Sequence, residues 1–245
     1  MKNILIIHPD DKSTFFLNRI KSKLKQDYND IIHFYNVKPN DLSHKNCIKL
    51  VANEQKIKLV VFLGHGKSDT LCGSKGNLYD GFGYHNEILL QEEPKDFYYN
   101  EHFINESNLE NFKGKNIFCL SCNSNEKIAL DAINAGVISF IGFGNIPTSI
   151  DEFKKLKYEY VSSDLVRSMK TEINYIIKTS LHLAIKHDFS IIELEKYIKF
   201  ISNQRISDIL INNKKYKDRY ILADNIYLFM KEMKIFGNKD SKLIL

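Results

Sequence analysis

Short runs of β-branched and apolar residues alternate with amphipathic stretches through the first 145 residues, and this alternation constrains the fold more than any other feature. Runs of this kind are typical of buried strands, whereas an apolar residue at every third or fourth position is typical of a helix. Strands alternating with helices indicate βαβ units, in which crossover helices join parallel strands. The sequence therefore predicts an α/β fold: a doubly wound, mostly parallel sheet with helices on both faces.

Five strands and at least three crossover helices follow from this pattern. After residue 147 the apolar period becomes helical, and its last series ends at Gly237. We expect residues 1–150 to form an α/β core and residues 151–245 to form a C-terminal helical annex packed on the same core. The strands are expected at Asn3–His8, Ile31–Val37, Lys58–Gly64, Asn116–Ser121 and Val137–Phe143, and the helices at Thr14–Gln26, Ser43–Glu54 and Glu126–Asn134.

The longest insert runs from residue 67 to residue 115 and contains most of the glycines that mark turns. A structureless loop of this length is uncommon inside a compact domain unless it is functional. We expect a hairpin near Leu78–Leu90 and a short helix near Asn105–Phe112. The insert lies between two strands of interest, so it is a candidate gate or self-cleavage segment.

Composition and charge exclude several classes of protein. The chain is 43% hydrophobic and 27% charged, which is typical of a folded globular protein. Its net charge of +5 is small, and the excess is spread along the residues after 150, so we expect no nucleic-acid partner. The apolar run at residues 4–7 is too short for a signal peptide or a membrane span. We expect a cytoplasmic protein, no membrane partner, and four cysteines that remain thiols.

Two predicted strands end in residues that carry chemistry. The third ends in the sequence VVFLGHG at residues 60–66, and the fourth in NIFCLSCNS at residues 116–124. Ligands bind at the carboxyl ends of parallel strands, so neighbouring strands would place His65 beside Cys122 as a base and a nucleophile. The amides of Gly66 and Cys122 are candidates for an oxyanion hole. Cys122 also precedes the helix expected from Glu126, whose N-terminal dipole favours a thiolate.

This order of motifs resembles the caspase-like (clan CD) cysteine peptidases, and most closely the bacterial CHAT-domain proteases. The resemblance continues in AINAGVISFIG at residues 132–142 and in IFGNKD at residues 235–240, which is similar to the Gly-Asp-Pro tail of many CHAT domains. It implies a caspase-like fold and an endopeptidase with His65 as general base and Cys122 as nucleophile. It also implies protein substrates, no cofactor and no metal, a regulatory protein partner, and a role in prokaryotic antiviral defence or cell death.

The substrate pocket is the next expectation from this resemblance. Relatives that cleave after Arg or Lys place an acidic residue in the stretch that matches Asp151, so Asp151 is a candidate pocket residue. Asp10 and Asp11 follow the first strand and are the substitutes. The alternative is structural, because each of these side chains is also suited to cap the helix that follows it.

Other interpretations remain open. Cys119 and Cys122 form a C-x-x-C pair, yet Cys119 lies inside a predicted buried strand, which favours a core residue over a redox site. A zinc site of Cys119, Cys122, His65 and Cys72 lacks a second paired spacing. The rival from another class is a catalytically inactive Rossmann-like binding module for a nucleotide or a protein partner. Neither a G-x-G-x-x-G motif nor a P-loop is present to hold phosphate.

Overall fold

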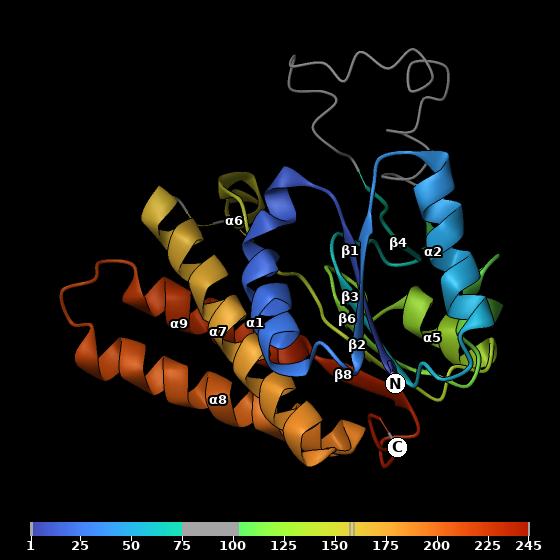
Figure 1. Cartoon of the computed structure of the whole chain (residues 1–245). Coiled ribbons are helices and arrows are strands. Elements are labelled where there is room, and N and C mark those ends of the chain that lie inside the picture. Colours follow the sequence, from blue (N-terminus) through green and yellow to red (C-terminus); the bar gives the residue numbers. More distant parts are fainter. Residues whose placement is uncertain (1, 75–102, 157, 159, 245) are drawn as a thin grey trace.

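The computed structural model describes residues 2–74, 103–156, 158 and 160–244, and within them the centre of the molecule is a six-stranded sheet (Figure 1). The strand order is β2-β1-β3-β6-β7-β8; the first five strands are parallel, and β8 runs antiparallel to β7. The predicted α/β class and its five strands are confirmed. The strands are β1 (Ile4–Pro9), β2 (Ile32–Val37), β3 (Leu59–Leu63), β6 (Asn116–Leu120), β7 (Ser139–Gly142) and β8 (Lys234–Gly237).

Helices cover both faces of the sheet, because alternate side chains of its central strands are apolar on both sides. Ile4 and Ile6 contribute to a core with α1 and the helices after residue 162, and we call this side the α7 face. Leu5 and Ile7 contribute to a second core with α2 and α5, and we call this side the α2 face. The helices are α1 (Asn18–Tyr28), α2 (Asp41–Asn53), α5 (Lys127–Asn134), α6 (Ile150–Lys155), α7 (Ser163–His187), α8 (Ile191–Asn212) and α9 (Arg219–Glu232).

The long helices α7, α8 and α9 lie together beside α1 on the α7 face (Figure 1). Ser162 caps the start of α7, and Ser190 and Glu193 form a capping box at the start of α8. The rings of Phe143, after β7, and Phe229, in α9, stack with their centroids 4.9 Å apart. One apolar core therefore continues from the sheet into these helices. None of the described helices is both long and apolar enough to cross a bilayer.

The end of the chain differs from the sequence prediction. The helical series expected to continue to Gly237 stops at Glu232, and Lys234–Gly237 forms β8 at the edge of the sheet, with Phe236 opposite Phe140. Gly237 has a φ of +79°, and a Cβ there would lie 2.4 Å from the carbonyl oxygen of Ile138. Glycine is therefore required where the chain leaves β8.

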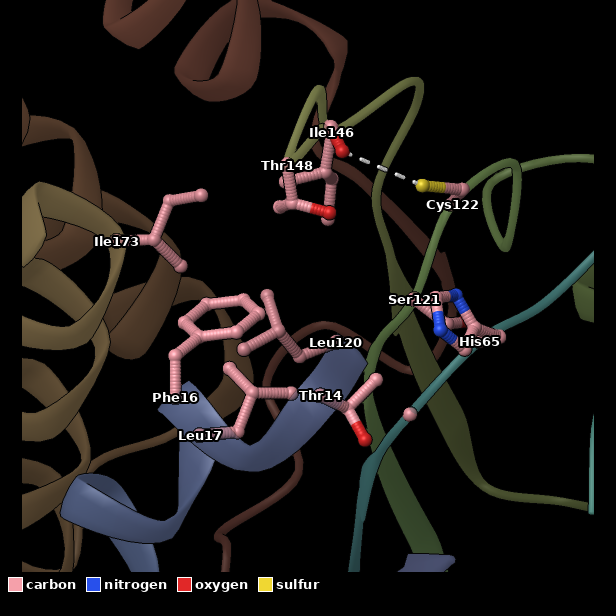
Figure 2. Close-up of a pocket in the computed structure, with 11 residues that line it drawn as sticks. Thr14, Phe16, Leu17, His65, Leu120, Ser121, Cys122, Ile146, Thr148 and Ile173 are labelled. Carbon is pink, nitrogen blue, oxygen red and sulfur yellow. Dashed lines mark hydrogen bonds between the residues drawn. The ribbon is translucent and has the colours of Figure 1, made fainter. Parts of the chain in front are cut away.

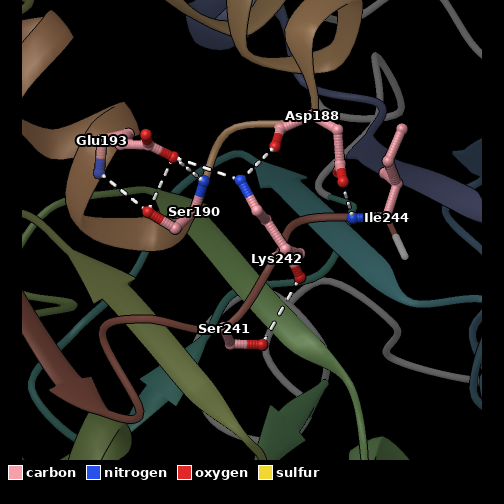
Figure 3. A network of polar contacts seen from close by, with 6 residues as sticks. All are labelled: Asp188, Ser190, Glu193, Ser241, Lys242 and Ile244. Carbon is pink, nitrogen blue, oxygen red and sulfur yellow. Dashed lines mark hydrogen bonds and ion pairs between the residues drawn. The ribbon is translucent and has the colours of Figure 1, made fainter.

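The last residues return to the turn between α7 and α8 (Figure 3). The Nζ of Lys242 donates to the carbonyl oxygen of Asp188 at 2.9 Å and lies 3.5 Å from Oε2 of Glu193. The amide of Ile244 donates to the side chain of Asp188 at 3.2 Å. These contacts fix the C-terminal tail against the helices.

Two further predictions differ in detail. The helix expected at Thr14–Gln26 begins as a 3-10 turn, η1 (Lys12–Leu17), before α1. In the insert, β4 (Thr70–Leu71) pairs with β5 (Ile104–Asn105), and the short helix expected near Asn105–Phe112 is the 3-10 turn η3 (Leu109–Phe112). The hairpin expected near Leu78–Leu90 lies outside the described residues.

Candidate active site

His65 and Cys122 lie at the same edge of the sheet, one beyond β3 and the other beyond β6. These strands are neighbours, and Leu63 is paired in register with Leu120. Each candidate residue lies two positions after its paired leucine. The register therefore brings residues 65 and 122 to the same edge of the sheet, where the order of motifs predicted them.

The two strand ends are also in direct contact. A Cβ on Gly66 would lie 2.5 Å from Oγ of Ser121 and 3.1 Å from the carbonyl oxygen of Cys122. Only glycine allows the loop after β3 to pack this closely on the loop after β6. The glycine after His65 therefore sets the approach of the two loops.

The amide of Gly66 has an orientation that suits an anion site. Gly66 is bridged to Leu71, and the hydrogen bonds of this bridge run from Cys72 N to His65 O at 2.9 Å and from Lys67 N to Thr70 O at 2.8 Å. In such a pair the central N–H points away from the partner strand. The N–H of Gly66 therefore faces away from Leu71, in keeping with the predicted oxyanion role.

A small cavity of about 20 Å³ lies on the α7 face of the sheet, beside the ends of β3 and β6 (Figure 2). It has room for about one water molecule. Both candidate residues line it, together with apolar side chains from η1 and from the loop after β7. The lining residues are Thr14, Phe16, Leu17, Gly64, His65, Leu120, Ser121, Cys122, Ile146, Thr148 and Ile173.

The thiol of Cys122 is held in a protonated form. Its Sγ points toward the carbonyl oxygen of Ile146, to which it donates at 3.6 Å (Figure 2). Burial raises the pKa of the Cys122 thiol to about 11, and the nearby Glu152 carboxylate raises it further. The helix after Cys122 begins close to its expected place, at Lys127, but burial of the thiol outweighs the effect of the helix N-terminus on its pKa, so a thiolate is not favoured in this conformation.

The turn that carries Cys122 is sharply defined. Asn123 has a φ of +55°, a left-handed conformation that asparagine tolerates better than most residues. The hydroxyl of Ser124 donates to the carbonyl oxygen of Ser121 at 2.8 Å and accepts from the amide of Phe143 at 2.9 Å. Because these bonds fix the loop to β7, the position of Cys122 is set by the backbone.

His65 is connected to Asp11 through Ser13. Oγ of Ser13 lies 2.5 Å from Nε2 of His65 and donates to Oδ1 of Asp11, also at 2.5 Å. A hydroxyl has one proton, so when Ser13 donates it to Asp11 it accepts a proton from His65. This arrangement favours a neutral His65 ring that carries its proton on Nε2.

Asp11 caps η1 and is also linked to the candidate base. It is 5% exposed, and its Oδ1 also accepts from the amide of Ser13 at 2.7 Å, so it caps η1 as the structural alternative predicted. Through the Ser13 hydroxyl it also reaches the candidate base. Sequence reasoning missed Ser13, because no motif marks a serine that contacts a residue 52 positions away.

None of the three candidate pocket acids, Asp10, Asp11 and Asp151, lines the cavity. Asp10 lies 3.4 Å from Nζ of Lys38, with which it forms an ion pair. Asp151 is exposed in the first turn of α6, whose N-cap is Ser149 rather than an aspartate. The neighbouring Glu152 instead turns back, and its Oε2 accepts from the amide of Thr148 at 2.6 Å. The carboxylate beside the site is therefore that of Glu152.

A second carboxylate, that of Glu232, connects the end of α9 to the site. Its Oε2 accepts from the amide of Asn145 at 3.0 Å, and its backbone oxygen accepts from Nδ2 of Asn125 at 2.7 Å. One residue thus holds both the loop after β6 and the loop after β7. Its contact with Asn125 spans 107 positions of sequence, so no local pattern predicts it.

The remaining cysteines are separate from the cavity. All four cysteines are free thiols, and Cys47, Cys72 and Cys119 are buried. Cys119 points into the core of the α2 face, and burial raises the pKa of its thiol to about 12. Its position supports the interpretation as a core residue. In the part of the chain that the structure describes, no three His, Cys, Asp or Glu side chains gather in a way that would hold a metal ion.

Comparisons with known proteins give no assignment. No protein-family model, no curated protein and no solved structure matches this chain.

Proposed function

We propose that the protein is a caspase-like cysteine endopeptidase of the CHAT type, in which Cys122 is the nucleophile and His65 the general base. The observation that carries the proposal is the convergence of the two strand ends: paired leucines precede both residues, Gly66 packs on Ser121 and Cys122, and both side chains line one cavity. A base and a nucleophile at adjacent strand ends are the parts that thiol acyl transfer needs.

The proposed reaction begins when the Cys122 thiol transfers its proton to Nδ1 of His65 and the sulfur attacks the peptide carbonyl. The amides of Gly66 and Cys122 stabilise the resulting oxyanion. His65 then gives its proton to the leaving amine, and the C–N bond breaks to leave a thioester. Water loses a proton to His65 and attacks the thioester, after which the C–S bond breaks and Cys122 regains its proton.

Ser13 and Asp11 have a positioning role in this scheme. When Nδ1 takes the thiol proton, the ring becomes positively charged, and Nε2–H remains bonded to Ser13. The Asp11 carboxylate beyond Ser13 stabilises that charge, as an acid behind a catalytic histidine does. The relay therefore fixes both the tautomer and the orientation of the base.

The thiol must turn away from Ile146 before it reacts. The bond to Ile146 and the cavity of about 20 Å³ describe a resting state, and a bound peptide would displace the segment of Ile146 and Thr148. Opening the site to water and to the imidazolium would lower the pKa of the Cys122 thiol from about 11, because burial is the main cause of its elevation. Substrate binding would thus activate the nucleophile.

The small cavity and the raised pKa of the Cys122 thiol favour the second candidate, an inactive module that binds a partner at this edge of the sheet. The two functions differ in a cleavage assay with unfolded protein substrates and a fluorogenic peptide panel. The peptidase predicts cleavage that is lost, with the fold retained by circular dichroism, in Cys122→Ala and in His65→Ala. Cleavage by either variant at the wild-type rate would refute the assignment of the dyad, and no cleavage by the wild type across both substrate sets would favour the binding module.

A further inference from the structure

A second and much larger hollow, of about 460 Å³, lies beside the candidate active site. It runs between η1 and the start of α1 on one side and the first half of α7 on the other, two segments that lie side by side in Figure 1. Phe16 lines both this groove and the active-site cavity. The basic groove, as we call it, is lined by Phe15, Phe16, Arg19, Ser163, Val166, Arg167, Lys170, Thr171 and Asn174.

The charged side chains that line the basic groove are all positive. Arg19, Arg167 and Lys170 line it, and its lining contains no Asp or Glu. Arg167 forms an exposed ion pair with Asp164 at 2.7 Å, which offsets part of its charge, so the positive charge of the groove comes mainly from Arg19 and Lys170. Nζ of Lys170 lies 5.3 Å from the centre of the Phe16 ring. Cations spaced along an open groove raise the local concentration of negatively charged ligands.

The same groove also offers apolar surface. Phe15 is 44% exposed, and Phe16 and Val166 line the groove beside it. A peptide with apolar side chains would bury this surface, whereas a phosphate polymer has no apolar groups to place against it. The lining therefore favours a peptide.

The length of the groove sets the length of its ligand. The lining residues of α7 extend from Ser163 to Asn174, a rise of about 16 Å along the helix. An extended peptide rises about 3.3 Å per residue, so about five residues cover this distance. The shared Phe16 places one end of that peptide beside the cavity that contains Cys122.

We propose that the basic groove is a substrate-docking site that binds an acidic, partly apolar segment of about five residues flanking the bond to be cleaved. Binding of the acidic segment to the groove does not depend on cleavage, but the identity of that segment as part of a substrate rests on the proposed peptidase function. Binding to this groove would hold the scissile region near Cys122 and would select substrates by charge at a distance from the cleavage point.

The test uses the full chain as Cys122→Ala, which binds without cleaving, and fluorescence anisotropy with a labelled peptide of alternating Glu and Leu. A peptide of alternating Lys and Leu and inorganic polyphosphate are the comparison ligands. We expect saturable binding of the acidic peptide that weakens at least about tenfold in Arg19→Glu and in Lys170→Glu, since each variant replaces an attraction by a repulsion. Lys186→Glu changes the same charge on an exposed part of α7 outside the groove and should leave binding unchanged.

Several results would overturn the docking site: no saturable binding of the acidic peptide, equal weakening by all three substitutions, or equal or tighter binding of polyphosphate at the same residues. Cleavage by the wild type tests the peptidase separately. If Arg19→Glu and Lys170→Glu weaken binding but the wild type does not cleave a substrate that carries the acidic segment, the groove is a docking site. Its ligand is then not a substrate.

Discussion

The two faces of the sheet use similar apolar side chains but enclose different chemistry. On the α2 face, Cys119 is fully buried against α2 and α5. On the α7 face, Leu120 lines the candidate cavity, and Cys122 follows two residues later with partial exposure. Side chains alternate along a strand. For this reason Cys119 packs in the core of the α2 face, while its neighbour Leu120 lines the candidate cavity on the α7 face. The candidate site therefore lies on the face covered by η1 and the long helices, and the α2 face is a sealed core at Cys119.

Acid is expected to cause the largest loss of stability, because each face of the sheet contains a buried histidine. Burial lowers the pKa of His8 to about 4, and burial likewise lowers the pKa of His44 to about 4. The contacts of His44 suit a neutral ring, because its Nδ1–H donates to the carbonyl oxygen of Asn40 and its Nε2 accepts from the amide of Ser74. Protonation would break the second contact.

The sign of the pH effect follows from these depressed values. Below the ordinary pKa of 6.5 the unfolded chain binds protons that the folded chain refuses, so stability is complete above pH 6.5 and is lost as the pH falls toward 4. Each histidine contributes about 3 kcal/mol to this loss. Urea unfolding of the wild type across this range measures it, and His44→Gln should reduce the drop by about half. An equal drop in that variant would show that His44 does not contribute to the acid sensitivity.

The relay on the α7 face gives the next largest expected effect. Ser13→Ala removes the bond to His65 and should lower kcat by about 10- to 100-fold with little change in KM, because the base loses its orientation while substrate contacts remain. Ser13→Thr keeps the hydroxyl and should restore most of the rate. The ¹⁵N spectrum of the His65 ring should show the proton on Nε2 in the wild type and a mixture of tautomers in Ser13→Ala. Unchanged spectra and rates would remove the relay from the mechanism.

The smallest expected change in stability separates the two cysteines of β6 and its loop. Cys119→Ala should keep full activity and lose about 1 to 2 kcal/mol of stability, because it leaves a small hole in the core of the α2 face. Cys122→Ala, at a partly exposed position, should cost less stability and all activity. Chemical denaturation and a cleavage assay of both variants check the pair. A folded but inactive Cys119→Ala protein would favour a joint role of the C-x-x-C pair.

The strands and the convergence of His65 and Cys122 were predictable because each depends on local patterns. β-branched runs mark the strands, and parallel neighbours meet at one edge. The helix predicted through to Gly237 was wrong at its end, because pairing with β7 makes Lys234–Gly237 a strand and local periodicity does not contain that contact. Tertiary context overrides local preference at such edges.

The supporting residues of the site could not be predicted for a related reason. Glu152 rather than Asp151 faces the site because Ser149 sets the start of α6, and adjacent helical residues point about 100° apart. Ser13 and Glu232 reach the site from distant parts of the chain. Their hydroxyl and carboxylate are indistinguishable in sequence from ordinary surface groups until the fold brings them to the loops.

The most direct test of the pairing of His65 with Cys122 is covalent labelling of the wild type with a panel of peptidyl acyloxymethyl ketones that differ in the residue before the ketone, read by intact mass and peptide mapping. We expect a single adduct on Cys122 with at least one peptide of the panel, at a rate that falls strongly in His65→Ala, and slower reaction of all cysteines with plain iodoacetamide. Equal labelling of Cys122 in His65→Ala, or labelling of Cys47, Cys72 or Cys119 in its place, would contradict the pairing of the histidine with this thiol.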